Sequence, residues 1–298
     1  MKATTSRLMI VLLIAAAPLT GEHVGTPAPA GAALSAAPGA QEMRALAEAY
    51  PDRIAELALR RGEWAVRVDD VWYTWAQGRL LPEDLSSRWE EYSSYRFYSY
   101  SPGKLPPLPR LDEDTRRRLQ QRLEQSAASP PVRHPGFLSA VYEAPTRGTT
   151  EARLRTLRLM AFEVRVHERL VRPLTAVNEQ LARLAQSDPE VENFIRGLKG
   201  LAGYNWRTIA GTRSRSYHSY GLAIDLEPAS FNGRHTYWRW ALPANQEWYT
   251  IPYEERWLVP AKVVAAFEEQ GFVWGGKWLF FDTMHFEYRP EILLLARD

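Results

Sequence analysis

The sequence predicts an α+β fold, because strand-like and helix-like patterns follow one another without regular alternation. Residues 221–226 and 279–287 have the apolar alternation of strands, and two β-rich runs within 63–75 flank a turn and predict a hairpin. Apolar residues recur at three- and four-residue steps over 151–186, which predicts one long helix or two. Proline before and glycine after 260–270 mark another helix. With 298 residues, the chain suffices for one large domain or two modest ones.

The N-terminus has the pattern of an export signal. Lys2 and Arg7 precede an apolar run over 8–17, which is too short for the roughly 20 residues of a membrane-spanning helix. We therefore predict a signal peptide over 1–30 and a flexible tether, rich in Ala, Pro and Gly, over 31–40. The alternative is an uncleaved N-terminal anchor. An exported chain would work in the periplasm or cell envelope, and would meet the membrane only through its signal.

Residues 41–150 are expected to form an N-terminal region whose role the sequence leaves open, and 151–298 the domain that carries the chemistry. A helical pattern covers 41–61, and 112–125 predicts a charged helix. Between them, 82–109 is rich in aromatic residues and proline. Its rings either form an adhesive surface or pack against a neighbouring domain, since aromatic side chains bury large areas in both cases.

Composition excludes several classes of function. The chain has no cysteine, which rules out disulfides, thiolate metal sites, cysteine nucleophiles and acylated anchors. Any metal must therefore be held by histidine and carboxylate side chains. The net charge of +2 does not indicate a nucleic-acid partner.

An acidic residue lies inside the strand predicted near the C-terminal third of the chain. Aliphatic residues alternate along 222–226, so Asp225 and the small Ala223 share the other face. A buried carboxylate is costly unless a metal or an arginine pairs with it. Gly221 permits a sharp turn, which would bring His218 back beside Asp225.

A second acid and a second histidine follow sixty residues later. His285 lies in the strand predicted over 279–287, and Asp282 precedes it by three residues. Together with His218 and Asp225, His285 completes a set of ligands suited to zinc, and Asp282 offers a carboxylate for proton transfer. A structural polar cluster is the alternative. The helical H-E-x-x-H zinc motif is absent, and His167 is expected to be structural.

These two segments resemble the M15 metallopeptidases. Residues 216–225 read Ser-x-His-x-x-Gly-x-Ala-x-Asp, which is similar to the signature of that family. The family includes D-alanyl-D-alanine carboxypeptidases and dipeptidases, and L-alanyl-D-glutamate endopeptidases. Residues 274–286 read Trp-Gly-Gly-x-Trp and then Asp-x-x-His-Phe, which resembles the endopeptidase branch. The resemblance covers roughly 165–290 and leaves the N-terminal region unexplained.

The resemblance implies a small, mainly antiparallel sheet that carries one zinc ion on one face, with helices packed behind it. It makes His218, Asp225 and His285 the metal ligands and Asp282 the general base. Co²⁺ or Mn²⁺ would suit the same ligands.

The resemblance also implies residues that bind substrate. Arg207 is expected to hold carbonyl or carboxylate oxygens through its permanently charged fork, with Arg213 as the competitor. Ser216 is expected to hold substrate or a ligand by hydrogen bonding, and Tyr220 and Trp278 to wall the cleft.

The implied activity is zinc-dependent hydrolysis of a peptide bond in peptidoglycan stem peptides, at an interior bond of the L-Ala-D-Glu type. A D-alanyl-D-alanine carboxypeptidase, a non-catalytic zinc-containing cell-wall-binding module and a scaffold that works through its aromatic N-terminal region are the alternatives. The expected partner is peptidoglycan or a muropeptide, with no nucleic acid and no obligate protein partner.

Overall fold

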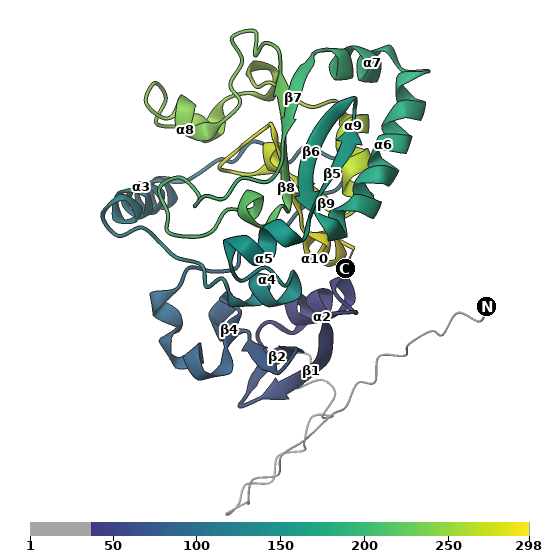
Figure 1. Cartoon of the computed structure of the whole chain (residues 1–298). Coiled ribbons are helices and arrows are strands. Elements are labelled where there is room, and N and C mark those ends of the chain that lie inside the picture. Colours follow the sequence, from purple (N-terminus) through teal and green to yellow (C-terminus); the bar gives the residue numbers. More distant parts are fainter. Residues whose placement is uncertain (1–36, 298) are drawn as a thin grey trace, which may run out of the picture. The chain divides into compact units, whose positions relative to one another are not determined.

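The computed structural model describes residues 37–297, which divide into two compact units (Figure 1). The first unit contains the chain up to Phe97 together with Val132–Val141. The second contains Tyr98–Pro131 and the chain from Tyr142 onward. The separate roles expected for 41–150 and 151–298 stay a prediction.

The predicted signal peptide over 1–30 lies outside the described residues, as does most of the predicted tether over 31–40. Among the helices of 37–297, none combines the length and the hydrophobicity that a membrane span requires.

The first unit is built on an antiparallel meander with the strand order β1-β2-β3-β4. The hairpin predicted over 63–75 is confirmed, because β2 pairs with β3 across Asp69 and Asp70. The helix predicted over 41–61 is wrong in its second half, which forms β1. Pro51 ends the helix there, since proline cannot continue the helical hydrogen bonding. The elements are α2 Ala40–Ala49, β1 Ile54–Arg60, β2 Glu63–Val68, β3 Val71–Thr74, η1 Ala76–Gly78, β4 Leu81–Pro82, η2 Glu83–Glu91 and α4 Gly136–Val141.

Aromatic packing forms the core of this unit. The ring of Phe137 in α4 meets Tyr50, Tyr73 and Tyr95 edge-on, with centroids 5.6–6.4 Å apart. Tyr95, from the aromatic segment over 82–109, is only 2% exposed. This part of the segment therefore packs inside its own unit.

The second unit begins with 98–131, which contains α3 (Glu113–Ala128) and confirms the predicted charged helix. Asp112 caps α3, because its carboxylate accepts a hydrogen bond of 2.7 Å from the Thr115 amide. After the crossing to the first unit and back, the chain forms α5 (Arg147–Ala152).

The helical prediction over 151–186 is wrong in its first half, which forms a hairpin of β5 (Leu154–Leu159) and β6 (Phe162–His167). Met160 and Ala161 have positive φ angles of 48° and 70°, as in a two-residue hairpin turn. Apolar residues two apart, at 157 and 159 and at 162, 164 and 166, follow strand alternation, and they overlap the three- and four-residue steps on which the helical prediction is based. The second half of the prediction is confirmed by η3 Glu168–Leu170 and α6 Val171–Ala185, and α7 Pro189–Arg196 follows outside the predicted range.

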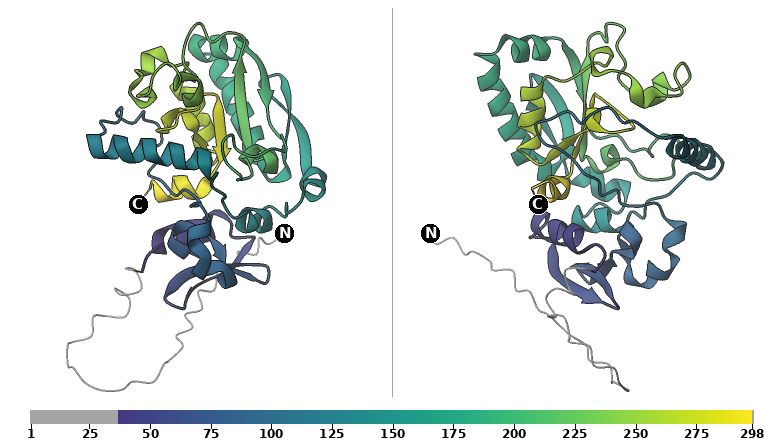
Figure 2. Two further views of the ribbon diagram at one scale, coloured as in Figure 1. Left: turned by 90° about the vertical axis from the view of Figure 1, so that its left-hand side faces the viewer. Right: turned by 180° about the vertical axis from the view of Figure 1, so that it is seen from behind.

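A four-stranded antiparallel sheet, in the order β7-β8-β10-β9, occupies the centre of the second unit. In Figures 1 and 2, α6 and α9 lie on one side of these strands and the segment with α8 on the other. This arrangement confirms the predicted α+β fold with a small antiparallel sheet. The elements are β7 Leu198–Ala202, η4 Tyr217–Tyr220, β8 Ala223–Pro228, α8 Trp238–Ala241, η5 Trp248–Thr250, η6 Tyr253–Glu255, α9 Ala261–Glu268, β9 Phe272–Trp274, η7 Gly275–Lys277, β10 His285–Tyr288 and α10 Pro290–Leu295.

Burial decides which face of the sheet is polar. The aliphatic residues of 222–226 are fully buried, and Phe286 stacks on Phe267 of α9 with ring centroids 4.3 Å apart. Because strand side chains alternate, this packing directs Asp225 and His285 to the opposite face.

Candidate metal centre

The pairing of β8 with β10 brings the first two candidate ligands together. Asp225 and His285 are direct partners in the antiparallel register. Side chains at such positions are neighbours, and here the Asp225 Oδ1 lies 2.7 Å from the His285 Nδ1. The predicted strand over 279–287 is shorter than expected, because β10 begins at His285 and the Asp282 amide bonds to the Gly275 carbonyl outside the sheet.

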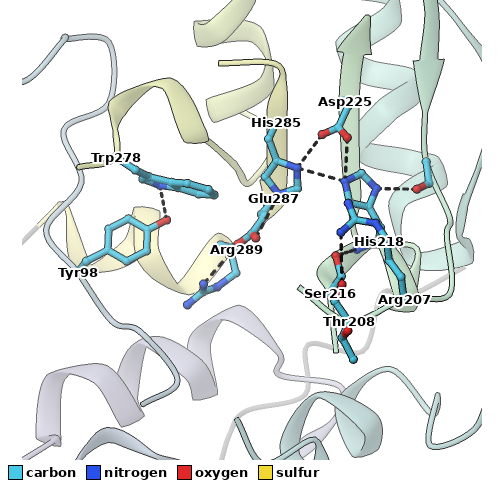
Figure 3. Close-up of polar contacts among 11 residues, drawn as sticks. Tyr98, Arg207, Thr208, Ser216, His218, Asp225, Trp278, His285, Glu287 and Arg289 are labelled. Atoms are coloured by element: carbon cyan, nitrogen blue, oxygen red, sulfur yellow. Dashed lines mark hydrogen bonds and ion pairs between the residues drawn. The ribbon is translucent and has the colours of Figure 1, made fainter. Parts of the chain in front are cut away.

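The turn that precedes β8 supplies the third ligand, His218. Gly221 adopts a φ of 70°, and a β-carbon there would lie 2.6 Å from the His167 backbone nitrogen. Only glycine fits this close approach, which folds η4 back over the strand. The His218 Nε2 lies 3.2 Å from the Asp225 Oδ2 and 3.2 Å from the His285 Nδ1. Ligand atoms of the three residues all lie within 4.8 Å of one another, and Figure 3 shows the three side chains pointing together.

Both imidazole rings are fixed by a second hydrogen bond on the side away from the cluster. The His218 Nδ1 donates to the Gly203 carbonyl at 2.6 Å, which leaves its Nε2 directed at Asp225. The His285 Nε2 donates to the Glu287 carboxylate at 3.2 Å, which leaves its Nδ1 directed at the cluster. Such outer partners are characteristic of metal-binding histidines, because they select the tautomer and the ring orientation.

The charged groups of the cluster shift one another's pKa values. Burial alone would raise the pKa of the Asp225 carboxyl, but the charges and hydrogen bonds of His285 and His218 hold it well below its usual range. Burial alone would lower the pKa of His285, but the carboxylates of Asp225 and Glu287 raise it well above its ordinary value. A metal ion needs the neutral imidazole, so a cation and a proton compete for the His285 Nδ1.

Asp282 lies in the loop before β10, three residues before His285. One oxygen of its carboxylate is a buried hydrogen-bond acceptor. Its Oδ1 has no hydrogen-bond partner among the described residues. Burial is the main reason that its pKa rises to about 6, and Asp225 adds to the rise while His285 opposes it. Gly275 allows the loop to close, since a β-carbon there would lie 2.5 Å from the Asp282 carbonyl oxygen. A buried carboxylate with a pKa near neutrality is suited to general acid–base work.

A cleft of about 360 Å³ opens beside the cluster, and Arg207 lines it together with His218 and Asp225. The Ser219 hydroxyl holds the Arg207 backbone in place by accepting its amide at 2.8 Å. Arg213 instead donates through its Nε to the Pro130 carbonyl at 3.1 Å. A larger hollow of about 570 Å³ lies along α6 and contains none of these residues.

The structure places the other predicted residues in different settings. Ser216 is buried and its hydroxyl caps η4 by accepting the His218 amide at 3.3 Å. Tyr220 is fully buried, so the structure does not bring it to the cleft surface. Trp278 is partly exposed and its ring centroid lies 5.7 Å from that of His285. His167 hydrogen-bonds through Nε2 to the Tyr142 carbonyl at 2.9 Å, and burial lowers its pKa to about 4, which suits a structural role.

Several supporting residues were missed at the sequence level. Glu287 follows His285 by two positions in β10, so strand alternation alone would have placed it on the same face. Behind it, Arg289 is 2% exposed and bonds through Nε to the fully buried Glu291 at 2.5 Å. The Arg289 Nη1 lies 3.7 Å from the Glu287 Oε2, so a chain of alternating charges backs the His285 ring.

The residues present fit a zinc ion. Two imidazole nitrogens and one carboxylate oxygen converge, and each ring is oriented by an outer acceptor. The Asp282 carboxylate interacts electrostatically with all three residues, and its buried Oδ1 has no partner among the described residues. Catalytic zinc typically has three such protein ligands and keeps a further position for water.

Residues 210–288 match a family model of the M15 peptidases that is described as D-alanyl-D-alanine carboxypeptidase. This segment contains the three residues of the cluster as well as Asp282. The match supports membership of the M15 peptidases. Residues 42–97, in the first unit, match a domain of unknown function, DUF8518. No curated protein and no solved structure matches the chain.

The outer partner of His285 in this M15 segment can be tested directly. We expect Glu287→Gln to weaken zinc affinity by about 10- to 100-fold, because an amide cannot supply the negative charge that strengthens His285 as a ligand. Competition with a chromophoric chelator measures this affinity. The exposed Glu254→Gln in the same unit serves as the matched control. Unchanged affinity in Glu287→Gln would show that Glu287 does not support the metal centre.

Proposed function

We propose that the chain is an exported zinc peptidase that hydrolyses a peptide bond in peptidoglycan stem peptides. One observation carries the proposal: His218, Asp225 and His285 converge within an M15 segment, beside a buried carboxylate oxygen of Asp282 that has no partner among the described residues. A metal site of purely structural use would not require that additional acid.

The chemistry divides between the metal and the protein. A zinc ion held by His218, Asp225 and His285 would supply Lewis-acid activation of water and of the scissile carbonyl. Asp282 takes the proton from the attacking water and returns it to the departing nitrogen. Its pKa of about 6 suits both steps, since the group is ionised at neutral pH yet basic enough to hold a proton briefly.

Arg207 is the substrate-binding cation in this proposal. It lines the cleft with two of the metal ligands, and its planar fork can donate to two oxygens at once. It would hold a substrate carbonyl or carboxylate and stabilise the negative charge that develops on the substrate oxygen. Trp278 would form an apolar wall on the His285 side.

The bond that is cut has two candidates. An interior bond of the L-Ala-D-Glu type is favoured by the Trp-Gly-Gly-x-Trp sequence at 274–278, which resembles the endopeptidase branch. The description of the matching family favours the terminal D-alanyl-D-alanine bond, whose free carboxylate Arg207 could bind through both nitrogens of its fork.

Digestion of purified peptidoglycan tests the proposal. We expect the exported form of the chain, without the N-terminal signal, to release new stem-peptide fragments, and chelation to stop the release until zinc is restored. Mass spectrometry identifies the bond from the fragment masses. A folded, zinc-loaded protein that binds peptidoglycan but releases nothing would instead indicate a non-catalytic wall-binding module.

A further inference from the structure

A strap of residues 98–103 belongs to the second unit although it lies far outside the M15 segment of 210–288. It contacts the loop of 274–278 that precedes the last metal ligand. Several hydrogen bonds hold it there, and they involve both its side chains and its backbone.

A buried acid fixes one end of the strap. The Glu268 carboxylate accepts hydrogen bonds from the Tyr100 hydroxyl at 2.5 Å and from the Gly103 amide at 2.7 Å. It also pairs at 2.5 Å with the Nζ of Lys277, and both charged side chains are only 4% exposed.

The same lysine binds the strap directly. The Lys277 Nζ donates to the Ser101 carbonyl at 2.8 Å, and the Tyr100 hydroxyl accepts the Trp274 amide at 2.9 Å. An ion pair this deeply buried tolerates little displacement, because either charge would be left without compensation. The strap and the loop are therefore locked in one relative position.

The other end of the strap reaches the metal centre. The Tyr98 hydroxyl accepts a hydrogen bond of 3.0 Å from the Trp278 Nε1, and the two rings meet edge-on at 6.2 Å. Trp278 in turn lies 5.7 Å from the His285 ring. In Figure 3, Tyr98 and Trp278 lie to one side of the metal ligands and Arg207 to the other.

We propose that Tyr98 is a substrate-positioning residue, which holds Trp278 as an aromatic wall on the side of the metal centre away from Arg207. The inference rests on the proposed function. The indole ring of Trp278 suits the aliphatic parts of a stem peptide, such as an alanine methyl group. Since Tyr98 lies outside the M15 segment, the position of Trp278 depends on a residue that the segment does not contain.

Tyr98→Phe tests the wall, because it keeps the ring and removes only the hydroxyl that Trp278 bonds. We expect KM for a soluble muropeptide to rise about three- to tenfold, the range of one neutral hydrogen bond, with kcat within about twofold of the parent. Zinc affinity should stay unchanged. The matched control is Tyr253→Phe, which removes a hydroxyl bonded to the Pro106 carbonyl at 2.8 Å, away from Trp278.

A second variant and a double variant test whether Tyr98 acts through Trp278. Trp278→Phe should raise KM at least as much, because it removes part of the ring as well as the hydrogen bond. Adding Tyr98→Phe to it should have little further effect, because the hydrogen bond between the two residues is already broken. Additive effects on KM, or an unchanged KM in Tyr98→Phe, would contradict the proposed role of Tyr98. Neither result would contradict the proposed peptidase function. If the parent protein neither cleaves nor binds the muropeptide, the proposed function fails and this inference fails with it.

The attachment of the strap through Glu268 can be measured without an activity assay. In Glu268→Gln, hydrogen exchange at the Gly103 and Trp274 amides should accelerate at least about tenfold relative to the parent, since both amides are protected through this cluster. Unchanged exchange at both amides would show that Glu268 does not hold the strap.

Discussion

Replacing Asp282 by asparagine is expected to lower kcat by about 10³-fold, within the range that one general acid–base group contributes. Asparagine has nearly the same shape but cannot accept the proton of the attacking water. The metal ligands are untouched, so zinc affinity should remain close to that of the parent. Steady-state hydrolysis of a muropeptide, together with chelator competition for zinc, measures both quantities on the same preparation.

The pH dependence of kcat/KM shows whether Asp282 acts as a general base or has only a structural role. Asp282 works as a base only when it is ionised, so kcat/KM of the parent should fall tenfold per pH unit on the acid side of its pKa, which is about 6 in the metal-free site. A bound dication favours the carboxylate form, which moves this limb to lower pH. The limb should be absent from the residual activity of Asp282→Asn. The exposed Asp114→Asn is the control, and an Asp282→Asn enzyme with parental kcat would remove Asp282 from the mechanism.

Replacing Asp225 by asparagine is expected to weaken zinc binding by more than about 100-fold. Loss of an outer partner of a ligand costs about 10- to 100-fold, and loss of a ligand itself should cost more. The change removes the anionic ligand and leaves two neutral nitrogens, a poor site for a dication. Hydrolysis should disappear at zinc concentrations that saturate the parent. Chelator competition gives the affinity, and thermal unfolding with and without zinc gives an independent measure, since a ligand that binds only the folded state stabilises it.

A control substitution in the same strand tests whether a change in β8 weakens zinc binding by disturbing the sheet. Glu227 follows Asp225 by two positions in β8 and is not part of the cluster. Glu227→Gln should therefore retain parental zinc affinity. If Asp225→Asn also retained it, the three converging side chains would be a hydrogen-bonded cluster and the proposed metal centre would be wrong.

The sequence by itself determined the chemistry-bearing positions. Alternation over 222–226 put Asp225 on the polar face of a strand, and the positions of His218, Asp282 and His285 matched a family pattern. These inferences hold because strand alternation and short motifs are local properties of the chain. The hairpin of 154–167 was missed for a related reason, since its short alternating runs at 157–159 and 162–166 overlap the apolar spacing of a helix.

Only the tertiary structure decided how distant residues meet. The pairing of His285 with Asp225 depends on the register of β8 and β10, and Glu268 reaches Tyr100 across 168 positions of the chain. No local pattern marks Tyr98 as a neighbour of Trp278, because their contact arises from the path of the strap over the folded unit. Long-range contacts of this kind follow from the packing of whole elements, and local propensity does not encode them.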